Sequence, residues 1–144
     1  MKNFKKIILA EDNIADVELT KLAFKALDLN IEVCHVFDGQ QLMDRLRLHP
    51  IDDIALILLD LNMPKMGGLD VLKEMYEDEE LRKLPVVVFT SSLHESDVHA
   101  CYEFGANAYV SKPLDINDFH KTIAAIANFW TEINVLPAFN GVSL

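Results

Sequence analysis

The feature that most constrains the fold is a regular alternation of short apolar runs with longer amphipathic segments. The most apolar run, 54–59, contains only Ile, Ala and Leu. Continuous apolar runs of this length, rather than alternating ones, are typical of strands buried on both faces of a parallel sheet. We predict strands at 6–10, 31–36, 54–59, 86–89 and 108–110, and helices at 14–27, 40–48, 69–76, 96–104 and 116–133.

Five strand–helix units in succession predict an α/β fold in which helices cover both faces of a parallel sheet. Right-handed crossovers leave few strand orders, and we take the doubly wound, flavodoxin-like order 2-1-3-4-5 from known folds of this pattern. Gly105 is expected to end the fourth helix in the left-handed conformation, and Asp115 to cap the last helix. The chain is interpreted as one domain, 1–133, followed by a C-terminal tail, 134–144.

Composition narrows the class of function. The net charge of −10 argues against a nucleic-acid surface, which needs Lys and Arg to neutralise phosphates. No stretch reaches the roughly 18 apolar residues of a membrane span, and the run at 7–10 is too short for a signal peptide. Cys34 and Cys101 match no metal or redox spacing. We therefore expect a soluble, cytoplasmic protein that binds neither nucleic acid nor membrane.

Polar side chains occur where four of the predicted strands end. Glu11 and Asp12 follow the first strand, Asp60 follows the third, Thr90 the fourth, and Lys112 the fifth. In the order 2-1-3-4-5 these positions converge at one end of the sheet, where ligands bind in open parallel folds. Three clustered carboxylates repel one another unless a cation joins them, and oxygen ligands of this kind suit Mg²⁺. The sequence therefore predicts a magnesium site with a hydroxyl and an amine beside it.

Four motifs, in fixed order and spacing, carry a resemblance to a known family. They are Glu11-Asp12-Asn13, the segment 58–68 (LLDLNMPKMGG), Phe89-Thr90-Ser91 and Lys112-Pro113. Together they resemble the receiver domain of two-component signalling, over about 5–133. The resemblance implies the receiver fold and a response regulator, not a conventional enzyme, that accepts a phosphoryl group from a histidine kinase. A receiver without an effector domain would act through protein–protein contacts or pass the phosphoryl group on.

The resemblance also implies a role for each acidic residue. Asp60 corresponds to the phosphoacceptor, a carboxylate nucleophile that becomes an acyl phosphate. Asp12 corresponds to a direct Mg²⁺ ligand, and Glu11 to a ligand that acts through water. Asp60 itself and the backbone carbonyl of Asn62 would complete the protein's share of the metal site.

Three further positions are implied in phosphoryl binding and in the switch. Lys112 would pair with a phosphoryl oxygen, or with Asp60 before phosphorylation, and Thr90 would turn its hydroxyl toward the phosphoryl group. Tyr109 corresponds to an aromatic that moves inward with Thr90. The Lys112–Pro113 bond is expected to be cis, as is usual in the family. The five histidines are not clustered, and we interpret them as surface or packing residues.

The last predicted helix has more apolar residues than one core-facing stripe needs. The stripe at spacings of four and three comprises Phe119, Ile123, Ile126, Trp130 and Ile133. Phe129 lies off this stripe, and the tail adds Leu136, Pro137, Ala138 and Phe139. This ending resembles the small receivers paired with phytochrome-type histidine kinases, which tend to dimerise. We predict a homodimer through Phe129, Trp130 and the tail. Alternatively, the tail folds back over its own domain.

Three other functions compete with this interpretation. A phosphatase of the haloacid-dehalogenase type would also use an aspartyl nucleophile and Mg²⁺, but it needs an Asp two residues on as general acid, where this chain has Asn62. A flavin-binding module would need a Ser/Thr/Gly-rich phosphate loop after the first strand, where Glu11 and Asp12 stand instead. A phosphorelay intermediate would share the chemistry at Asp60 and differ only in its partner, so the sequence does not separate it from an output receiver.

Overall fold

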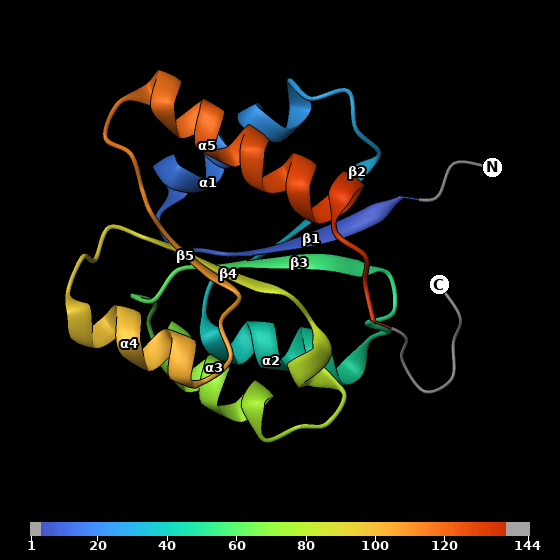
Figure 1. Ribbon diagram of the computed structural model, residues 1–144, viewed down its shortest axis with the longest axis vertical. Helices are drawn as coiled ribbons and strands as arrows, with labels where there is room; N and C mark the ends of the chain where they lie inside the picture. Colours follow the sequence, from blue (N-terminus) through green and yellow to red (C-terminus); the bar gives the residue numbers. More distant parts are fainter. Residues whose placement is uncertain (1–3, 138–144) are drawn as a thin grey trace.

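The protein folds around a five-stranded parallel sheet in the order β2-β1-β3-β4-β5 (Figure 1). This computed structural model describes residues 4–137. Every neighbouring pair of strands is parallel, so the predicted fold class and strand order are confirmed. The strands are β1 (Lys5–Ala10), β2 (Ile31–Val36), β3 (Ile54–Leu59), β4 (Val86–Thr90) and β5 (Ala108–Ser111).

Helices cover both faces of this sheet, with α1 and α5 on one side and α2, α3 and α4 on the other (Figure 1). Their ends lie close to the predicted ones, except that the last helix changes type before it finishes. A short 3₁₀ turn before β4 was not predicted. The elements are α1 (Ile14–Lys25), α2 (Gly39–Leu48), α3 (Gly68–Tyr76), the 3₁₀ turn η1 (Leu81–Lys83), α4 (Glu95–Glu103), α5 (Ile116–Asn128) and the π-helical turn η2 (Phe129–Ile133).

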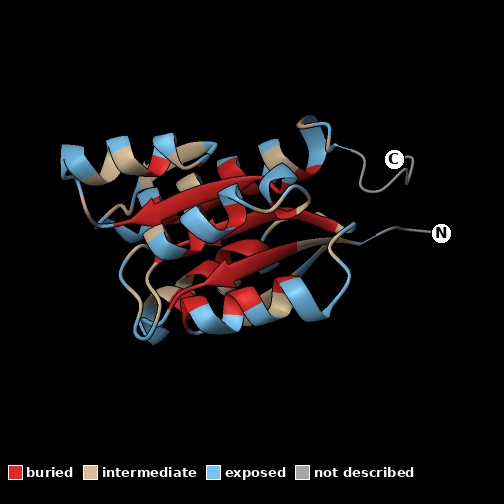
Figure 2. Ribbon diagram, turned by 90° about the horizontal axis from the view of Figure 1, so that it is seen from below, coloured by how far each residue is buried: buried red, intermediate tan, exposed pale blue. Residues whose placement is uncertain are grey.

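The core has two layers, one on each face of the sheet, and β3 is buried along its whole length. Figure 2 shows the buried strands between helices whose outer faces are exposed. On the α1/α5 side, Phe89 of β4 meets Phe119 of α5 edge to face, with ring centroids 5.3 Å apart. Each fully buried Leu, Ile or Phe contributes on the order of 1.5–3 kcal/mol. A sheet packed in this way holds the ends of its strands in fixed relative positions.

Both predicted helix-end signals are confirmed. Gly105, just after α4, has φ 89°, in the left-handed region that glycine enters without steric penalty. The side chain of Asp115 accepts a hydrogen bond from the Asp118 amide at 3.0 Å and so caps α5. Asn13 caps α1 in the same way, through the amide of Asp16 at 3.1 Å. The start of α1 is therefore fixed directly beside the end of β1.

The apolar stripe predicted for the last helix is wrong at its final position. Ile133 is 60% exposed, whereas Thr131 is 2% exposed and donates its hydroxyl to the carbonyl of Ala127 at 2.7 Å. The cause is the π-helical turn, in which the amide of Asn134 bonds the carbonyl of Phe129, five residues earlier, at 2.7 Å. A wider turn shifts the angular position of the residues that follow, so the 3.6-residue period no longer predicts which side chain faces the sheet.

Within residues 4–137, none of the helices combines the length and the hydrophobicity needed to cross a lipid bilayer. Of the tail, residues 134–137 are described, whereas 138–144, which include Ala138 and Phe139, lie outside the described residues. The division into a domain at 1–133 and a tail at 134–144 stays a prediction.

Candidate phosphoacceptor and metal site

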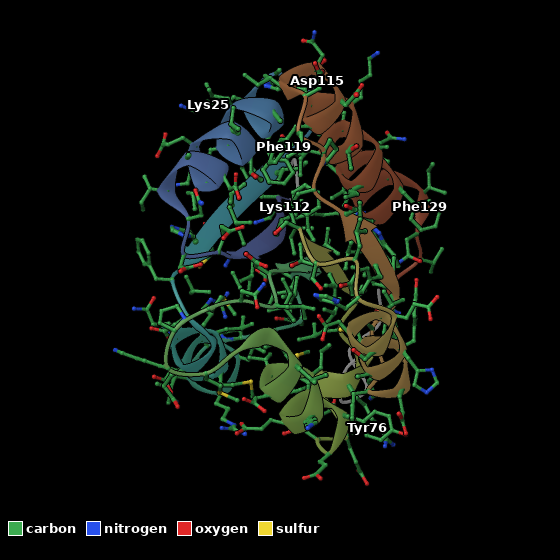
Figure 3. All side chains as sticks on the ribbon, turned by 90° about the vertical axis from the view of Figure 1, so that its left-hand side faces the viewer. Lys25, Tyr76, Lys112, Asp115, Phe119 and Phe129 are labelled. Atoms are coloured by element: carbon green, nitrogen blue, oxygen red, sulfur yellow. The ribbon has the colours of Figure 1, made fainter. Side chains whose placement is uncertain are left out.

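The carboxyl ends of the strands carry a group of buried polar side chains. Glu11 follows β1, Asp60 follows β3, and Thr90 ends β4; they are 3%, 7% and 0% exposed. Lys112 follows β5 and lies at the centre of this end of the sheet, beneath α1 and α5 (Figure 3). Burying charged groups costs free energy unless they are paired and hydrogen-bonded. Because this cost is met at one place in the fold, the group is a candidate functional site.

Three carboxylates at this end lie close enough together to share a cation. One carboxylate oxygen from each of Glu11, Asp12 and Asp60 lies within 4.8 Å of the others, and Asp12 is exposed to solvent. Oxygen donors in such a cluster, open on one side for water, fit a hard divalent cation. The backbone amide of Asn62 donates to Asp60 Oδ1 at 3.3 Å. The metal role of the Asn62 carbonyl stays a prediction.

The amine of Lys112 bonds two of these carboxylates, Glu11 and Asp60, and a further one, Asp16. Its Nζ donates to Glu11 Oε1 at 2.5 Å, Asp16 Oδ2 at 2.8 Å and Asp60 Oδ2 at 3.1 Å. Burial alone would lower the pKa of Lys112. The hydrogen bonds to Asp16 and Glu11 and the negative charge of Asp60 outweigh burial, so its pKa is raised and the amine stays charged.

One ammonium does not balance this many carboxylates. Burial raises the pKa of Glu11 from 4.5 to about 7; the hydrogen bond from Lys112 opposes that shift, and the neighbouring Asp60 carboxylate adds to it. Repulsion between like charges at short range disfavours ionising both acids. Without a further cation, the excess of negative charge is relieved only when Glu11 keeps its proton.

The two predicted switch residues meet at Ser92, in the loop between β4 and α4. The Ser92 amide donates to Thr90 Oγ1 at 3.4 Å, and the half-buried Tyr109 donates its hydroxyl to the Ser92 carbonyl at 2.9 Å. The Ser92 hydroxyl in turn donates to Asp97 Oδ2, on α4, at 2.6 Å. The loop is thus bonded to the carboxyl end of β4, to β5 and to α4, so a movement of Thr90 or Tyr109 would act on the same loop.

The expected cis peptide at Lys112–Pro113 is wrong, because the described residues contain no cis peptide bond. The trans form of an X–Pro bond is lower in energy by about 0.5–1 kcal/mol. With this bond trans, Lys112 already reaches Glu11, Asp16 and Asp60, so the geometry of the site does not require the less stable isomer.

Sequence reasoning missed Asp16. This residue lies in the first turn of α1, and its carboxylate is one of the three partners of Lys112. A signal was present, because Asp16 stands four residues after Asp12, one helical turn on, at the start of the helix that begins at the site. It was not among the predicted site residues because it is not part of the strand-end motifs.

His35 was also missed, having been interpreted as a surface or packing residue. Its Nε2 lies 2.7 Å from the carbonyl oxygen of Glu11, so this nitrogen carries the proton and donates. The β1–β2 ladder ends where the amide of Glu11 bonds the carbonyl of Val36 at 3.1 Å. The imidazole therefore supplies the Glu11 carbonyl with a donor just where β2 ends. Only the strand register, with Leu9 opposite His35, reveals this contact.

The glycine that opens α3 permits the helix to approach Asp60 closely. A Cβ at Gly68 would lie 2.5 Å from the carbonyl oxygen of Asp60, closer than two non-bonded atoms can come. The Gly68 amide donates to the Leu61 carbonyl at 2.9 Å. The helix thus starts directly against the strand end that presents Asp60.

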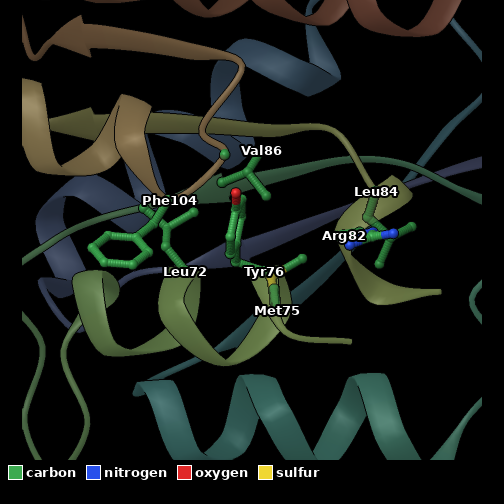
Figure 4. A pocket seen from close by; sticks show the side chains of 8 residues that line it. Leu72, Met75, Tyr76, Arg82, Leu84, Val86 and Phe104 are labelled. Atoms are coloured by element: carbon green, nitrogen blue, oxygen red, sulfur yellow. The ribbon is translucent and has the colours of Figure 1, made fainter. Parts of the chain in front are cut away.

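A separate pocket of about 130 Å³ lies where α3 and the end of α4 face η1 and β4 (Figure 4). Its lining is mainly apolar, with Arg82 as its one charged side chain, and none of the predicted site residues contributes to it. The residues around it are Leu72, Met75, Tyr76, Arg82, Leu84, Val86, Phe104 and Gly105. This pocket is therefore separate from the buried polar side chains at the carboxyl ends of the strands.

A doubly wound five-stranded sheet with acids and a lysine at these strand ends defines a receiver. The chain belongs to the response regulator receiver domain family, which matches residues 7–124. It is 38% identical over 138 residues to the response regulator Rcp1 of Synechocystis sp., covering 93% of this chain and 94% of Rcp1.

Solved structures give the same result. The phosphorylated cyanobacterial phytochrome response regulator RcpA superposes with a TM-score of 0.87 at 36% identity, over 94% of this chain and 99% of RcpA. The Mn²⁺-bound form of Rcp1 superposes with a TM-score of 0.86 at 38% identity, over 93% and 99% of the two chains. The chain is therefore a receiver that resembles phytochrome response regulators over nearly its whole length.

Proposed function

We propose that this protein is a response regulator, not a conventional enzyme, that accepts a phosphoryl group on Asp60 from a histidine kinase. The observation that carries the proposal is the convergence of Glu11, Asp12 and Lys112 on Asp60 at the ends of different strands. Phosphoryl transfer needs alignment and charge neutralisation more than covalent help from the protein. These residues supply both.

In the proposed transfer, a carboxylate oxygen of Asp60 attacks the phosphorus of a phosphohistidine. The new O–P bond forms as the N–P bond breaks, and the bonding electron pair returns to the imidazole nitrogen. Lys112, whose Nζ lies 3.1 Å from Asp60 Oδ2, is placed to neutralise phosphoryl oxygens. The Asn62 amide fixes Asp60 Oδ1 through its hydrogen bond, so the carboxylate is oriented before the donor arrives.

The metal of this site is proposed to be Mg²⁺, held by Glu11, Asp12, Asp60 and the backbone carbonyl of Asn62. A bound Mg²⁺ supplies positive charge that offsets the carboxylates and the incoming phosphoryl oxygens. The Mn²⁺-bound form of the similar protein Rcp1 supports a divalent cation. The excess of carboxylates over ammonium groups in this chain supports it independently.

The proposed readout is a change at the β4–α4 loop. The Thr90 hydroxyl would exchange its contact with the Ser92 amide for a phosphoryl oxygen, and Tyr109, bonded to the Ser92 carbonyl, would move with that loop. The altered α4–β5 surface would then bind a partner protein.

The kinase partner is proposed from the surface around the site. Ile14, Leu114 and Ile116 are 57%, 103% and 59% exposed. Ile14 begins α1, Leu114 lies between β5 and α5, and Ile116 begins α5. Exposed apolar side chains grouped beside a reactive residue suit a protein partner. The similar protein RcpA is a cyanobacterial phytochrome response regulator. The proposed partner of this chain is therefore a phytochrome-type histidine kinase.

A homodimer through the end of the last helix is part of the proposal. Phe129 is 43% exposed and packs edge to face on Trp130, with ring centroids 5.0 Å apart. Val135, farther along, is 87% exposed. Sedimentation velocity of Phe129→Asp against wild type tests this, with Leu48→Asp, at an exposed apolar residue of α2, as the matched control. A dimer that persists in Phe129→Asp contradicts this interface.

The experiment that tests the central proposal is intact-mass analysis after incubation with acetyl phosphate, with Mg²⁺ or with EDTA. We expect a single phosphoryl adduct in Mg²⁺, none in EDTA, and none in Asp60→Asn. Asp52→Asn, an exposed aspartate at the opposite end of the sheet, should be modified like wild type. A folded wild type that gains no adduct in Mg²⁺, or an adduct that survives Asp60→Asn, would overturn the proposal.

A further inference from the structure

Asp16 differs from the other carboxylates of the site in one respect. It bonds Lys112 at 2.8 Å, yet it is not one of the three acids whose oxygens cluster for a cation. Its side chain is 26% exposed, whereas those of Glu11 and Asp60 are 3% and 9% exposed. Its backbone is fixed by the Asn13 cap at the start of α1. Asp16 therefore offers Lys112 a hydrogen-bond acceptor that is not among the carboxylates expected to bind the metal.

The other two partners of Lys112 have a competing use. Glu11 and Asp60 each bond Nζ, at 2.5 Å and 3.1 Å, and both belong to the cluster that would hold a divalent cation. A cation bound there would compete with the Lys112 ammonium for the oxygens of Glu11 and Asp60, and its positive charge would repel the ammonium. An ammonium that is only 10% exposed cannot replace lost partners freely with water. How tightly the metal binds thus depends on what remains for Lys112 to bond.

We propose that Asp16 is a positioning residue that keeps Lys112 partnered when a divalent cation takes the oxygens of Glu11 and Asp60. By remaining bonded to Nζ, it lowers the cost of that exchange and so raises the affinity of the site for Mg²⁺. It also keeps the amine beside Asp60, because one Nζ reaches both carboxylates at once. The inference rests on the proposed function, since it assumes that the cluster binds Mg²⁺.

The test is isothermal titration calorimetry of Mg²⁺ into a double-mutant cycle of Asp16→Ala and Lys112→Met. We expect Asp16→Ala to weaken Mg²⁺ binding roughly fivefold to tenfold, the size of a coupling of about 1–1.4 kcal/mol between charged neighbours. In the Lys112→Met background, where no ammonium has to be kept partnered, the same substitution should change the dissociation constant by less than about twofold. Asp16→Asn, which keeps the shape of the side chain, serves if Asp16→Ala is poorly folded by circular dichroism.

The control for loss of one negative charge is Glu18→Ala, an exposed acid on the same helix, which should leave the Mg²⁺ affinity within about twofold. Equal weakening by Asp16→Ala in both backgrounds would overturn the inference, because Asp16 would then act by general charge or as a ligand. Wild-type affinity in Asp16→Ala would overturn it as well, while the proposed function stood. A wild type that binds no Mg²⁺ would instead contradict both the inference about Asp16 and the proposed Mg²⁺-dependent function.

Discussion

The two ends of the sheet each carry a lysine–aspartate pair, and the pairs behave differently. At the carboxyl end, Lys112 and Asp60 lie 3.1 Å apart, with side chains 10% and 9% exposed. At the amino end, Lys6 and Asp53 lie 3.0 Å apart, with side chains 28% and 40% exposed. The separation is almost the same, so distance does not distinguish the pair at the candidate site from the pair at the other end. Burial and the local count of charges do.

At the amino end, one lysine faces one aspartate. At the carboxyl end, Lys112 bonds Asp60 and two further carboxylates, and Asp12 stands beside them. The amino-end pair is balanced in charge and more exposed to solvent, so it needs no further cation. The carboxyl-end group is buried and has more carboxylates than ammonium groups, so a proton on Glu11 or a second cation is needed to balance its charge. Four experiments can sharpen or break this contrast.

The largest effect is expected from removing the buried ammonium. Lys112→Met should lower the free energy of unfolding by about 3 kcal/mol in EDTA, because it leaves Glu11 and Asp60 buried without a counter-charge. Urea denaturation measures this loss. Millimolar Mg²⁺ should restore much of the lost stability, since it replaces the missing positive charge. If the loss is the same with and without Mg²⁺, the carboxylates do not form one electrostatic unit.

The next effect concerns pH. An acid in the unfolded chain loses its proton near 4.5, whereas burial holds the pKa of folded Glu11 at about 7. Between these values the folded state binds one proton more, so Glu11 makes stability fall as the pH rises from about 4.5 to 7. The difference between wild type and Glu11→Gln in EDTA should change by about 1–3 kcal/mol over that interval. Glu18→Gln, at an exposed acid, should show no such change.

A smaller effect is expected at His35, which donates to the Glu11 carbonyl and contacts the ring of Phe37 at a tilt of 57°, with ring centroids 4.2 Å apart. His35→Phe keeps a ring and removes the donor; His35→Gln keeps a donor nitrogen and removes the ring. We expect His35→Phe to cost about 1 kcal/mol of stability and to weaken Mg²⁺ binding. His35→Gln should retain the Mg²⁺ affinity. If the two variants have equal Mg²⁺ affinity, the hydrogen bond does not hold Glu11 in place.

The features that could be predicted are those set by local sequence pattern, such as an apolar run or a polar residue at the end of a strand. The apolar run of β3 predicts a buried central strand, and strand-end acids predict a cluster once the strand order is known. The order itself came from known folds, because local sequence does not encode which strands pair. Glu11, Asp12 and Asp60 could therefore be placed together from the sequence.

The parts that were missed depend on geometry between elements. Asp16 reaches Lys112 only because the first turn of α1 faces the end of β5, and His35 reaches Glu11 only through the register of β1 and β2. The π-helical turn at Phe129–Ile133 was invisible for a related reason: apolar residues continue at helical spacing while the hydrogen bonds change from four to five residues apart. A side-chain period cannot report a change in backbone hydrogen bonding.

The smallest effect belongs to the amino end, and it tests the contrast from its other side. Lys6→Met should leave the urea midpoint almost unchanged, with or without Mg²⁺, because an exposed one-to-one ion pair contributes little. Asp53 Oδ1 is buried without a hydrogen-bond partner, a cost that the wild type already bears and that Lys6→Met leaves unchanged. If Lys6→Met shifted the midpoint as far as Lys112→Met does in EDTA, the count of carboxylates around each lysine would not explain why the two ends differ.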